Sequence, residues 1–568
     1  MPGFLPRRRA AFRVHGMDCA EEVSLLRRTL SETPGITELT FDVLQGRMEV
    51  EYDPERVSPG TILAAVERAG MAAEPWEEPS RRSAWRDWIP TLQILISGAL
   101  FGCGALMKAG AAGGGWVDWL ADHEGPVPAG AVLCYLGAIA AGFGPFLPKV
   151  WAALRGLRPD MNVLVAVSLV GAGFLGEWSE GAALAFLFAL AGRLERWSLE
   201  LARRSITSLF AQAPRQAAVL HSHGEHLLPV ERVPVGSLVR VRPGEKIPCD
   251  GEVVRGESRV NQAILTGESV AVPKRPGSRV YAGTLNTSGI LEIRTTSHAA
   301  DSTSSRIARM LGASDRRRAP SERLVERFAR VYTPLVLVIA VLVAFVPPLF
   351  FGGAWSRWLH EGMVVLLIAC PCALVISTPV TVAAALASAA RQGVLVKGGA
   401  FLEELARVRA MGLEKAGVLT LGCPDEGEDP PREEACQAVQ ELRRDGIAVH
   451  EGQASPFAEG GAWVTSSGAP HGDHLTIAFG SQSLDAALEN VEVVILADDL
   501  RRIPLAVRHA RRGLRVIRQN VAIAVGLKLA FLAVALSGSA TLWMALVADM
   551  GATWLVVLNG LRMLWIRR

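Results

Sequence analysis

Residues 367–380 read "LIACPCALVISTPV", in which two cysteines flank a proline within an apolar run. A proline inside a helix removes a backbone hydrogen bond and clashes with the preceding turn, at a cost of about 3 kcal/mol. Cys370 and Cys372 can face one cavity only where the helix is unwound, and soft thiolates bind transition-metal ions. The pattern predicts a helix opened at Pro371 that holds an ion at mid-membrane depth. A kink beside two small core cysteines is the alternative, because cysteine is often buried without a chemical role.

The composition places this helix in a membrane. The chain has 568 residues, of which 50% are hydrophobic and only 20% charged, and its mean hydropathy is positive. Such a chain is too apolar for a set of ordinary soluble domains. A membrane-spanning helix needs about 20 mostly apolar residues. Eight segments are candidates for spans: 90–109, 129–148, 161–177, 180–195, 331–351, 361–385, 520–537 and 540–564.

Basic residues gather on one side of these segments, in stretches such as "RLERWSLELARRS" and "RRIPLAVRHARRGLRVIR". The loop "AAGGGWVDWLADHEGPV" on the other side has no lysine or arginine. The positive-inside rule therefore predicts that both termini and the large loops are cytoplasmic. We expect an integral protein of the plasma (inner) membrane, with the lipid bilayer as its partner. The net charge of +3 then reflects topology, and nothing in the chain indicates nucleic-acid binding.

The polar segments divide the chain into domains. Residues 1–75 combine alternating strand patterns with helical periodicity, as in a small α+β domain, whereas residues 200–320 contain short strands rich in Val, Gly and Pro. The expected order is a domain at 1–75, a linker at 76–89, four helices in 90–199, a β-rich domain at 200–320, a helix pair carrying the two cysteines in 321–385, a third domain at 386–519 and two last helices in 520–568.

Several stretches resemble the heavy-metal branch of the P-type ATPases. The stretch "CPCALVISTPVTVAAALASAARQGVLVKGGAFLE" is similar to the ion-site helix of that family, and "PGEKIPCDGEVVRGESRVNQAILTGESVAVPK" to its actuator domain. The resemblance implies a multi-domain membrane protein with an α-helical transmembrane bundle of about eight helices. It also implies an N-terminal ferredoxin-like α+β metal-binding domain, a β-rich actuator domain and an α/β phosphorylation-type domain.

The last two helices indicate the metal class. Copper-exporting members carry a Tyr-Asn and a Met-Ser pair there; this chain instead has Asp549 in "ADMGAT" and Lys528 on the preceding helix. That arrangement resembles the zinc/cadmium/lead subgroup. Two thiolates and a carboxylate suit a borderline divalent ion, whereas Cu(I) favours sulfur alone. We expect zinc or a similar divalent heavy-metal ion as the ligand, with Lys528 as counter-ion to Asp549 when the site is empty.

Two further metal positions come from the resemblance. Glu177, in "GEWSEG" at a membrane boundary, corresponds to a possible release site, although a solvated interfacial glutamate is an equal alternative. The stretch "HGMDCAEE" resembles the heavy-metal-associated domain, but Cys19 stands alone, Glu22 takes the place of the second cysteine, and Asp18 is adjacent. One thiolate with carboxylates favours zinc over copper. A metal-free docking domain with surface acids is the alternative.

The phosphorylation motif departs from the family. The family phosphorylates the aspartate of Asp-Lys-Thr-Gly-Thr-Leu-Thr, and the aligned stretch here reads "EKAGVLT", in which Glu414 replaces the aspartate and Lys415 is retained. One extra methylene displaces the carboxylate by roughly 1 Å, which phosphoryl transfer tolerates poorly. The Thr-Gly-Asp, Gly-Asp-Gly-x-Asn-Asp and Ser-x-His-Pro motifs are absent, and no lysine lies between Ala416 and Leu527. The third domain is thus expected to be truncated, which casts doubt on ATP and magnesium binding.

The actuator retains the family's Thr-Gly-Glu-Ser loop, whose glutamate, Glu268 here, positions the hydrolytic water in the family. Three functions remain open. The favoured one is a protein that binds or passes divalent zinc, cadmium or lead after losing ATP-driven phosphorylation, and so is catalytically inactive. The alternatives are an active ATP-dependent exporter of these ions, and a non-functional relic or faulty gene model.

Overall fold

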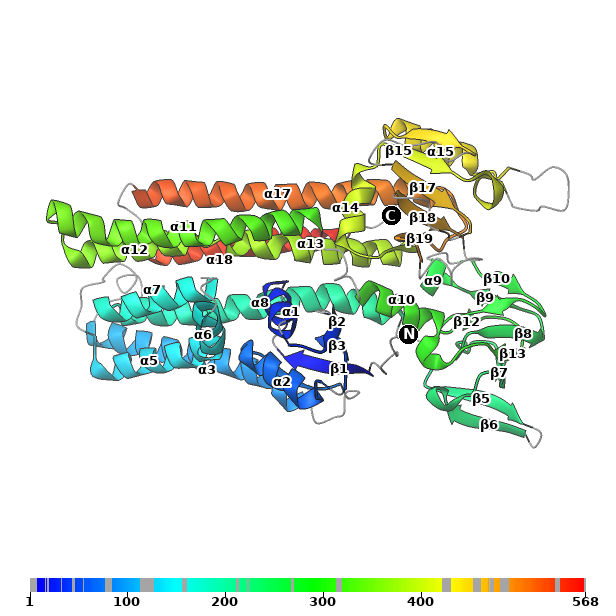
Figure 1. Cartoon of the computed structure of the whole chain (residues 1–568), viewed down its shortest axis with the longest axis horizontal. Helices are drawn as coiled ribbons and strands as arrows, with labels where there is room; N and C mark the ends of the chain where they lie inside the picture. Colours follow the sequence, from blue (N-terminus) through cyan, green and yellow to red (C-terminus); the bar gives the residue numbers. More distant parts are fainter. Residues whose placement is uncertain are drawn as a thin grey trace. The chain divides into compact units, whose positions relative to one another are not determined.

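The computed structural model describes two compact units (Figure 1). Unit 1 comprises Met1–Leu199, Ser321–Val380 and Ile517–Gly560, and unit 2 comprises Glu200–Pro320, Thr381–Val516 and Leu561–Arg568. The residues described are 8–15, 17, 20–31, 33–42, 46–54, 56–76, 84–112, 127–155, 161–210, 214–221, 224–266, 270–312, 319–420, 431–452, 461–467, 469, 474–480, 490–536 and 542–565.

Unit 1 begins with an antiparallel sheet in the order β2-β3-β1-β4, joined by two helices. Alternate residues of the strands face inward, so that Phe12, Phe41 and Val50 are fully or almost fully buried with Ile62 of a helix. This α+β arrangement agrees with the predicted strand and helix patterns. Its elements are β1 (Arg8–His15), α1 (Ala20–Ser31), β2 (Ile36–Asp42), β3 (Arg47–Tyr52), α2 (Pro59–Arg68) and β4 (Ala72–Pro75).

Long apolar helices make up the rest of unit 1, and several of them also include residues assigned to unit 2. Within the described residues, five helical stretches are long and apolar enough to cross a membrane: Thr91–Gly110, Ala129–Arg155, Pro320–Phe351, Trp355–Arg391 and Arg502–Val534. The other predicted spans fall in helices as well, but the count of eight stays a prediction. The helices are α3 (Ala84–Ala112), α5 (Ala129–Phe143), α6 (Leu147–Arg155), α7 (Met161–Leu175), α8 (Trp178–Phe210), α11 (Pro320–Phe351), α12 (Trp355–Ile368), α13 (Cys372–Arg391), α17 (Arg502–Leu536) and α18 (Leu542–Leu561).

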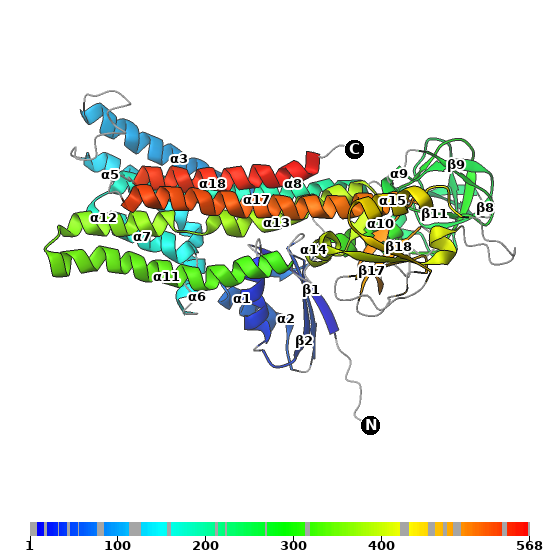
Figure 2. The same ribbon diagram turned by 90° about the horizontal axis from the view of Figure 1, so that it is seen from above.

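The predicted helix break is present. Helix α12 ends at Ile368 and α13 begins at Cys372, so the chain is unwound from Ala369 to Pro371 (Figure 2, where α12 and α13 follow one another end to end). The second proline, Pro379, lies inside α13 without ending it. The break therefore lies at the proline that separates the two cysteines.

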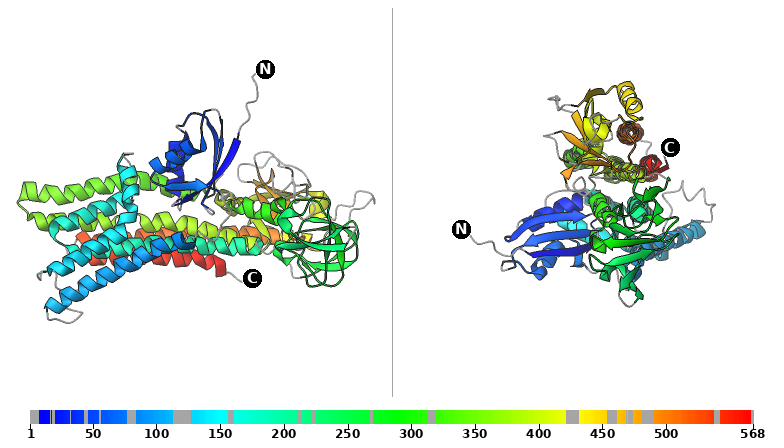
Figure 3. Two further views of the ribbon diagram at one scale, coloured as in Figure 1. Left: turned by 90° about the horizontal axis from the view of Figure 1, so that it is seen from below. Right: turned by 90° about the vertical axis from the view of Figure 1, so that its right-hand side faces the viewer.

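The first part of unit 2 is β-rich, as expected. It contains a six-stranded sheet in the order β11-β8-β13-β7-β5-β6 and a three-stranded sheet in the order β10-β9-β12. Both sheets belong to the segment drawn in green in Figure 3. The elements are β5 (Gln216–His221), β6 (Gly224–Pro229), β7 (Leu238–Val241), β8 (Gly251–Arg255), β9 (Ser258–Asn261), α9 (Ala263–Thr266), β10 (Val272–Lys274), β11 (Arg279–Val280), β12 (Leu285–Asn286), β13 (Leu291–Thr295) and α10 (Thr303–Gly312).

The second part of unit 2 is an α/β domain. Its sheet has the order β14-β19-β18-β17-β15-β16, and every pairing except β14 with β19 is parallel. The carboxyl ends of parallel strands share one edge, where sites of open α/β sheets lie. The elements are β14 (Val394–Val396), α14 (Gly399–Arg407), β15 (Ala410–Leu413), a short turn (Lys415–Leu419), α15 (Ala435–Arg444), β16 (Ala448–Glu451), β17 (Gly461–Thr465), β18 (Leu475–Phe479) and β19 (Val493–Ile495).

Asp250, which immediately precedes β8, supports the β-rich part. Its Oδ1 accepts a hydrogen bond from Ala282 N at 2.7 Å, and its Oδ2 accepts from Thr303 N at 2.6 Å and Thr303 Oγ1 at 2.7 Å. Asp250→Ala removes the buried acceptors of two backbone N–H groups, which should lower the unfolding free energy by about 3 kcal/mol. Pulse proteolysis of the full chain in urea measures this change.

Glu252→Ala is the matched control, because Glu252 lies two residues along the chain on β8 and is exposed. It should leave the urea midpoint unchanged. Equal midpoints for Asp250→Ala and Glu252→Ala would contradict the role given to Asp250.

Candidate functional site

The two cysteines of the helix break lie together, but not as the expected free thiols. The structure joins Cys370 and Cys372 in a disulfide, so both sulfurs lie on the same side of the unwound segment. In this structure the two cysteines therefore form a disulfide and are not the expected pair of free thiolates. A disulfide sulfur carries no negative charge, so this pair has to be reduced before it can bind a metal ion as thiolates.

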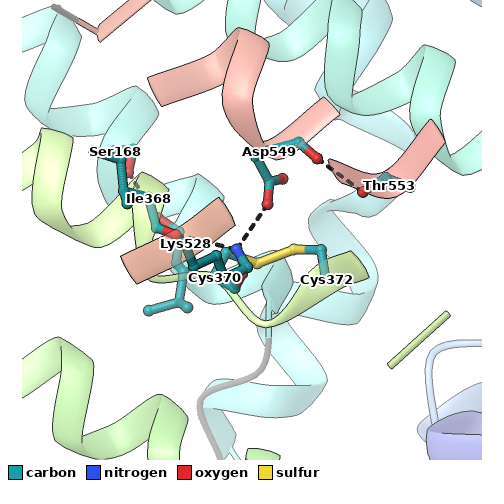
Figure 4. The surroundings of a disulfide bond; sticks show 8 residues. Ser168, Ile368, Cys370, Cys372, Lys528, Asp549 and Thr553 are labelled. Carbon is teal, nitrogen blue, oxygen red and sulfur yellow. Dashed lines mark hydrogen bonds and ion pairs between the residues drawn. A yellow bond between two sulfur atoms is a disulfide. The ribbon is translucent and has the colours of Figure 1, made fainter. Parts of the chain in front are cut away.

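Lys528 of α17 lies against the break. Its Nζ donates to the backbone carbonyl of Ile368 at 3.1 Å and to the carbonyl of Cys370, and it forms an ion pair with Asp549 Oδ1 at 3.0 Å (Figure 4). Asp549 is only 5% exposed, and its backbone carbonyl accepts a hydrogen bond from Thr553 Oγ1 at 2.9 Å. The structure thus brings Cys370, Cys372, Lys528 and Asp549 together, as the sequence predicts.

This arrangement can exchange one cation for another. The Lys528 ammonium now neutralises the Asp549 carboxylate and satisfies carbonyls that the helix break leaves without helical partners. With the cysteines reduced, the thiolates and the carboxylate form a mixed sulfur and oxygen ligand set. A divalent ion there would compete with the ammonium for Asp549.

Glu414, at the expected phosphorylation position, follows β15 at the carboxyl edge of the α/β sheet. Its Oε2 accepts hydrogen bonds from Ser466 N at 2.7 Å and Thr465 Oγ1 at 2.9 Å, and lies 3.1 Å from Ser466 Oγ. Both residues belong to the end of β17, the strand beside β15. The Glu414 carboxylate is therefore held by neutral donors from its own sheet. Lys415 beside it is exposed.

Arg432 fixes the turn that follows Glu414, and the sequence analysis missed it. Its guanidinium donates to the carbonyls of Gly417 and Thr420, both at 3.3 Å, and pairs with Asp498 Oδ1 at 3.0 Å. It also lies over the ring of Phe479, 5.2 Å from the centroid. No motif marks Arg432, since its partners come from three separate parts of the chain.

The remaining predicted residues have different outcomes. Asp18, Cys19 and Glu268 lie outside the described residues, and Glu22 lies in α1 without a described side chain. Glu177 lies between α7 and α8, close to Glu180 and His360, which the sequence analysis also missed. The spacing of Glu177 and Glu180 was an available signal, but nothing in the sequence links them to His360.

Thr266, the first residue of the Thr-Gly-Glu-Ser loop, lies close to the α/β part of unit 2. A β-carbon added to Gly393 would collide with the carbonyl oxygen of Thr266, the first residue of that loop. Gly393 has a φ of 75°, in the region that favours glycine, and directly precedes β14. The backbone of Thr266 therefore lies directly against the start of the α/β sheet.

Comparison with known protein families agrees with this architecture. Residues 11–71 match the heavy-metal-associated domain, and residues 211–312 match the P-type ATPase actuator domain. Both matches fall on parts described above, namely the N-terminal α+β domain of unit 1 and the β-rich part of unit 2.

Curated relatives extend the similarity over the chain. A probable cadmium-transporting ATPase of Staphylococcus aureus is 31% identical and aligns with 77% of this chain and 82% of its own length. A probable cadmium-transporting ATPase of Listeria monocytogenes is 27% identical over 98% of this chain and 99% of its own length. A zinc/cadmium/lead-transporting P-type ATPase of Escherichia coli is 26% identical over 98% of this chain and 93% of its own length.

These findings define the class as membrane proteins with a heavy-metal-associated domain and an actuator domain. The chain belongs to the heavy-metal P-type ATPase family. The alignment with the Listeria relative spans 727 positions, more than the 568 residues of this chain, so part of that relative has no counterpart here.

The disulfide leads to a first prediction about the metal site. Without reductant, peptides containing Cys370 and Cys372 should resist alkylation in denatured protein, and reduction should expose both thiols. The reduced full chain should then bind about one more zinc ion than the unreduced chain, because thiolates are zinc ligands. Mass spectrometry and metal analysis of the same sample measure the two effects.

Cys249 is the internal control, since its thiol is free and should be alkylated in denatured protein with or without reductant. Full alkylation of Cys370 and Cys372 without reductant would contradict the prediction. An unchanged zinc content after reduction would contradict it as well.

Proposed function

We propose that this protein binds divalent zinc, cadmium or lead ions at the broken helix of unit 1 and passes them across the membrane without ATP-driven phosphorylation. The proposal rests on a difference between two places in the protein, the broken helix with its cysteines and the position of the family's phosphorylated aspartate. The Lys528–Asp549 pair beside Cys370 and Cys372 keeps the parts of an ion site. The position of the family's phosphorylated aspartate is held by Glu414 in an internal hydrogen-bond network.

The geometry around Glu414 argues against a nucleophile. An aspartyl phosphate forms only when a free carboxylate oxygen is aligned with the γ-phosphate, with magnesium and lysine neutralising the developing charge. Here Oε2 is bound by Thr465 and Ser466, which occupy the neighbouring strand end. The turn after Glu414 is tied to Arg432 and Asp498. These contacts support a structural role for the motif.

The length of the chain supports the same reading. Residues 386–519 are too few for both a phosphorylation and a nucleotide domain of this family, and the alignment with the Listeria relative contains positions without counterparts here. The segment from Ala416 to Leu527 also contains no lysine for the phosphate site. We infer that ATP and magnesium do not serve as cofactors.

Other roles complete the proposal. Lys528 acts as counter-ion to Asp549 when no metal is bound, Glu177 takes part in release, and Cys19 with Asp18 and Glu22 forms a zinc-preferring site in residues 1–75. The protein resides in the plasma membrane with both termini in the cytoplasm, because the basic residues gather on that side of the predicted spans.

An active ATP-dependent exporter is the second candidate. The specific observation in its favour is that the relatives are named as cadmium- or zinc-transporting ATPases and align with most of this chain. The retained Lys415 and the retained Thr266 of the actuator loop also fit this function. The two candidates differ in whether a phosphoenzyme forms.

The metal site is tested by replacing its thiols. The reduced full chain carrying Cys370→Ala and Cys372→Ala should lose about one zinc or cadmium ion per chain relative to the wild type, because no thiolate remains at the helix break. Cys134→Ala, a free cysteine on α5, is the control and should keep the wild-type metal content. Equal metal content in the double variant and the wild type would refute this site.

Catalysis is tested in reconstituted, reduced protein. Zinc-stimulated ATP hydrolysis and acid-stable phosphoenzyme should both stay at background, since the chain lacks an aligned nucleophile and a phosphate-binding lysine beyond Lys415. Glu414→Asp should not restore activity, because the losses lie in several places. Assays of released phosphate and of labelled protein measure both.

Glu414→Ala provides the comparison for any residual signal. Zinc-dependent phosphate release that this substitution abolishes would support the exporter instead. Rescue of turnover by Glu414→Asp alone would show that the missing motifs have substitutes elsewhere in the chain.

A further inference from the structure

Three metal-ligating side chains converge at one end of the apolar helices of unit 1. They are Glu177, Glu180 and His360, and one ligand atom from each lies within 4.8 Å of the others. Together they offer one imidazole nitrogen and two carboxylate oxygens. No thiol takes part, so this ligand set differs in kind from that of Cys370 and Cys372.

The local structure explains why these residues meet. Gly176, with a φ of 78°, turns the chain between α7 and α8. Glu177 then precedes the first residue of α8 and Glu180 lies in its first turn, three residues later, and their carboxylates lie close together. His360 lies in the second turn of α12, which packs against α7; a β-carbon at Gly171 of α7 would collide with Met363 of α12.

The spacing suits a small divalent cation. Zinc ligands lie about 2.1 Å from the metal, so that neighbouring ligand atoms of a tetrahedral site are about 3.4 Å apart. The three ligand atoms, within 4.8 Å of one another, lie somewhat farther apart than in an occupied zinc site. Imidazole nitrogen and carboxylate oxygen are both protein ligands for zinc, and three such ligands leave a fourth position for water.

Burial and charge favour a cation at this place. Glu180 is 3% exposed, and the Lys108 ammonium, which is 8% exposed, interacts with it electrostatically. Carboxylates among apolar helices are costly and mark ion paths when they face the bundle interior. Lys108 supplies one positive charge near the two carboxylates, and a bound cation would further reduce the repulsion between Glu177 and Glu180.

We propose that Glu177, Glu180 and His360 form a second divalent-cation site with only nitrogen and oxygen ligands. The loops that border it, between α7 and α8 and before α12, lie on the side that the charge distribution predicts to be extracytoplasmic. Its use as an exit station rests on the proposed function, but its occupancy does not depend on transport, on ATP or on the cysteine pair.

The test removes the sulfur sites first. A full-length background variant with Cys19→Ser, Cys370→Ser and Cys372→Ser, in lipid nanodiscs, is titrated with zinc against a chelator of known affinity. It should bind one zinc ion. His360→Ala on this background should weaken that binding by at least about tenfold, since loss of even an outer-shell partner costs about 10- to 100-fold.

Glu361→Gln is the matched control, because Glu361 neighbours His360 on α12 but is outside the cluster. It should bind zinc as the background does. Equal zinc affinity for His360→Ala and Glu361→Gln would overturn the proposal, and so would a background variant that binds no zinc.

X-ray absorption is measured on the zinc-loaded background variant, which has no substitution in the cluster. It therefore tests the proposed site even if the His360→Ala variant fails to fold. Imidazole scattering with only nitrogen and oxygen in the first shell supports the site. Absence of imidazole scattering would overturn it. Failure of the cysteine-dependent function would leave this result unchanged, because the background already lacks those thiols.

Discussion

The membrane part of this protein depends on how an interrupted helix is satisfied. Within hydrocarbon, a backbone carbonyl without a partner costs several kcal/mol, so irregular backbone survives only where other groups bind it. Here the unwound segment from Ala369 to Pro371 is met by Lys528, which donates to the carbonyls of Ile368 and Cys370. The same ammonium pairs with Asp549, so one side chain stabilises both the break and the buried carboxylate.

The sequence predicted the parts of this site that have local or chemical causes. Proline disfavours a helix interior, so Pro371 between the two cysteines located the break without any knowledge of the fold, although Pro379 does not interrupt α13. Lys528 and Asp549 were singled out by resemblance to the zinc/cadmium/lead subgroup, and the cost of an unpaired charge in a membrane agrees with the ion pair that they form. The disulfide between Cys370 and Cys372 was missed, because the expectation of a metal site treated both sulfurs as reduced thiolates.

The contacts that sequence reasoning could not find all join distant segments. Arg432 binds Gly417, Asp498 and the ring of Phe479, which come together only when the parallel sheet has formed. His360 meets Glu180 only because α12 packs on α7. By contrast, strand alternation and helical periodicity are local, and they predicted the α+β domain and the β-rich domain well.

The carboxylates of Asp549 in unit 1 and Glu414 in unit 2 are bound by different kinds of group, and this difference bears on function. Asp549 is balanced by an ammonium, so a divalent ion bound to Asp549 would replace one cation by another and displace the ammonium of Lys528. Glu414 is balanced by a backbone N–H and two hydroxyl groups, which carry no charge that magnesium could replace. Among the described residues, a metal ion at Glu414 would therefore find no bound cation to replace, in contrast to a metal ion at Asp549.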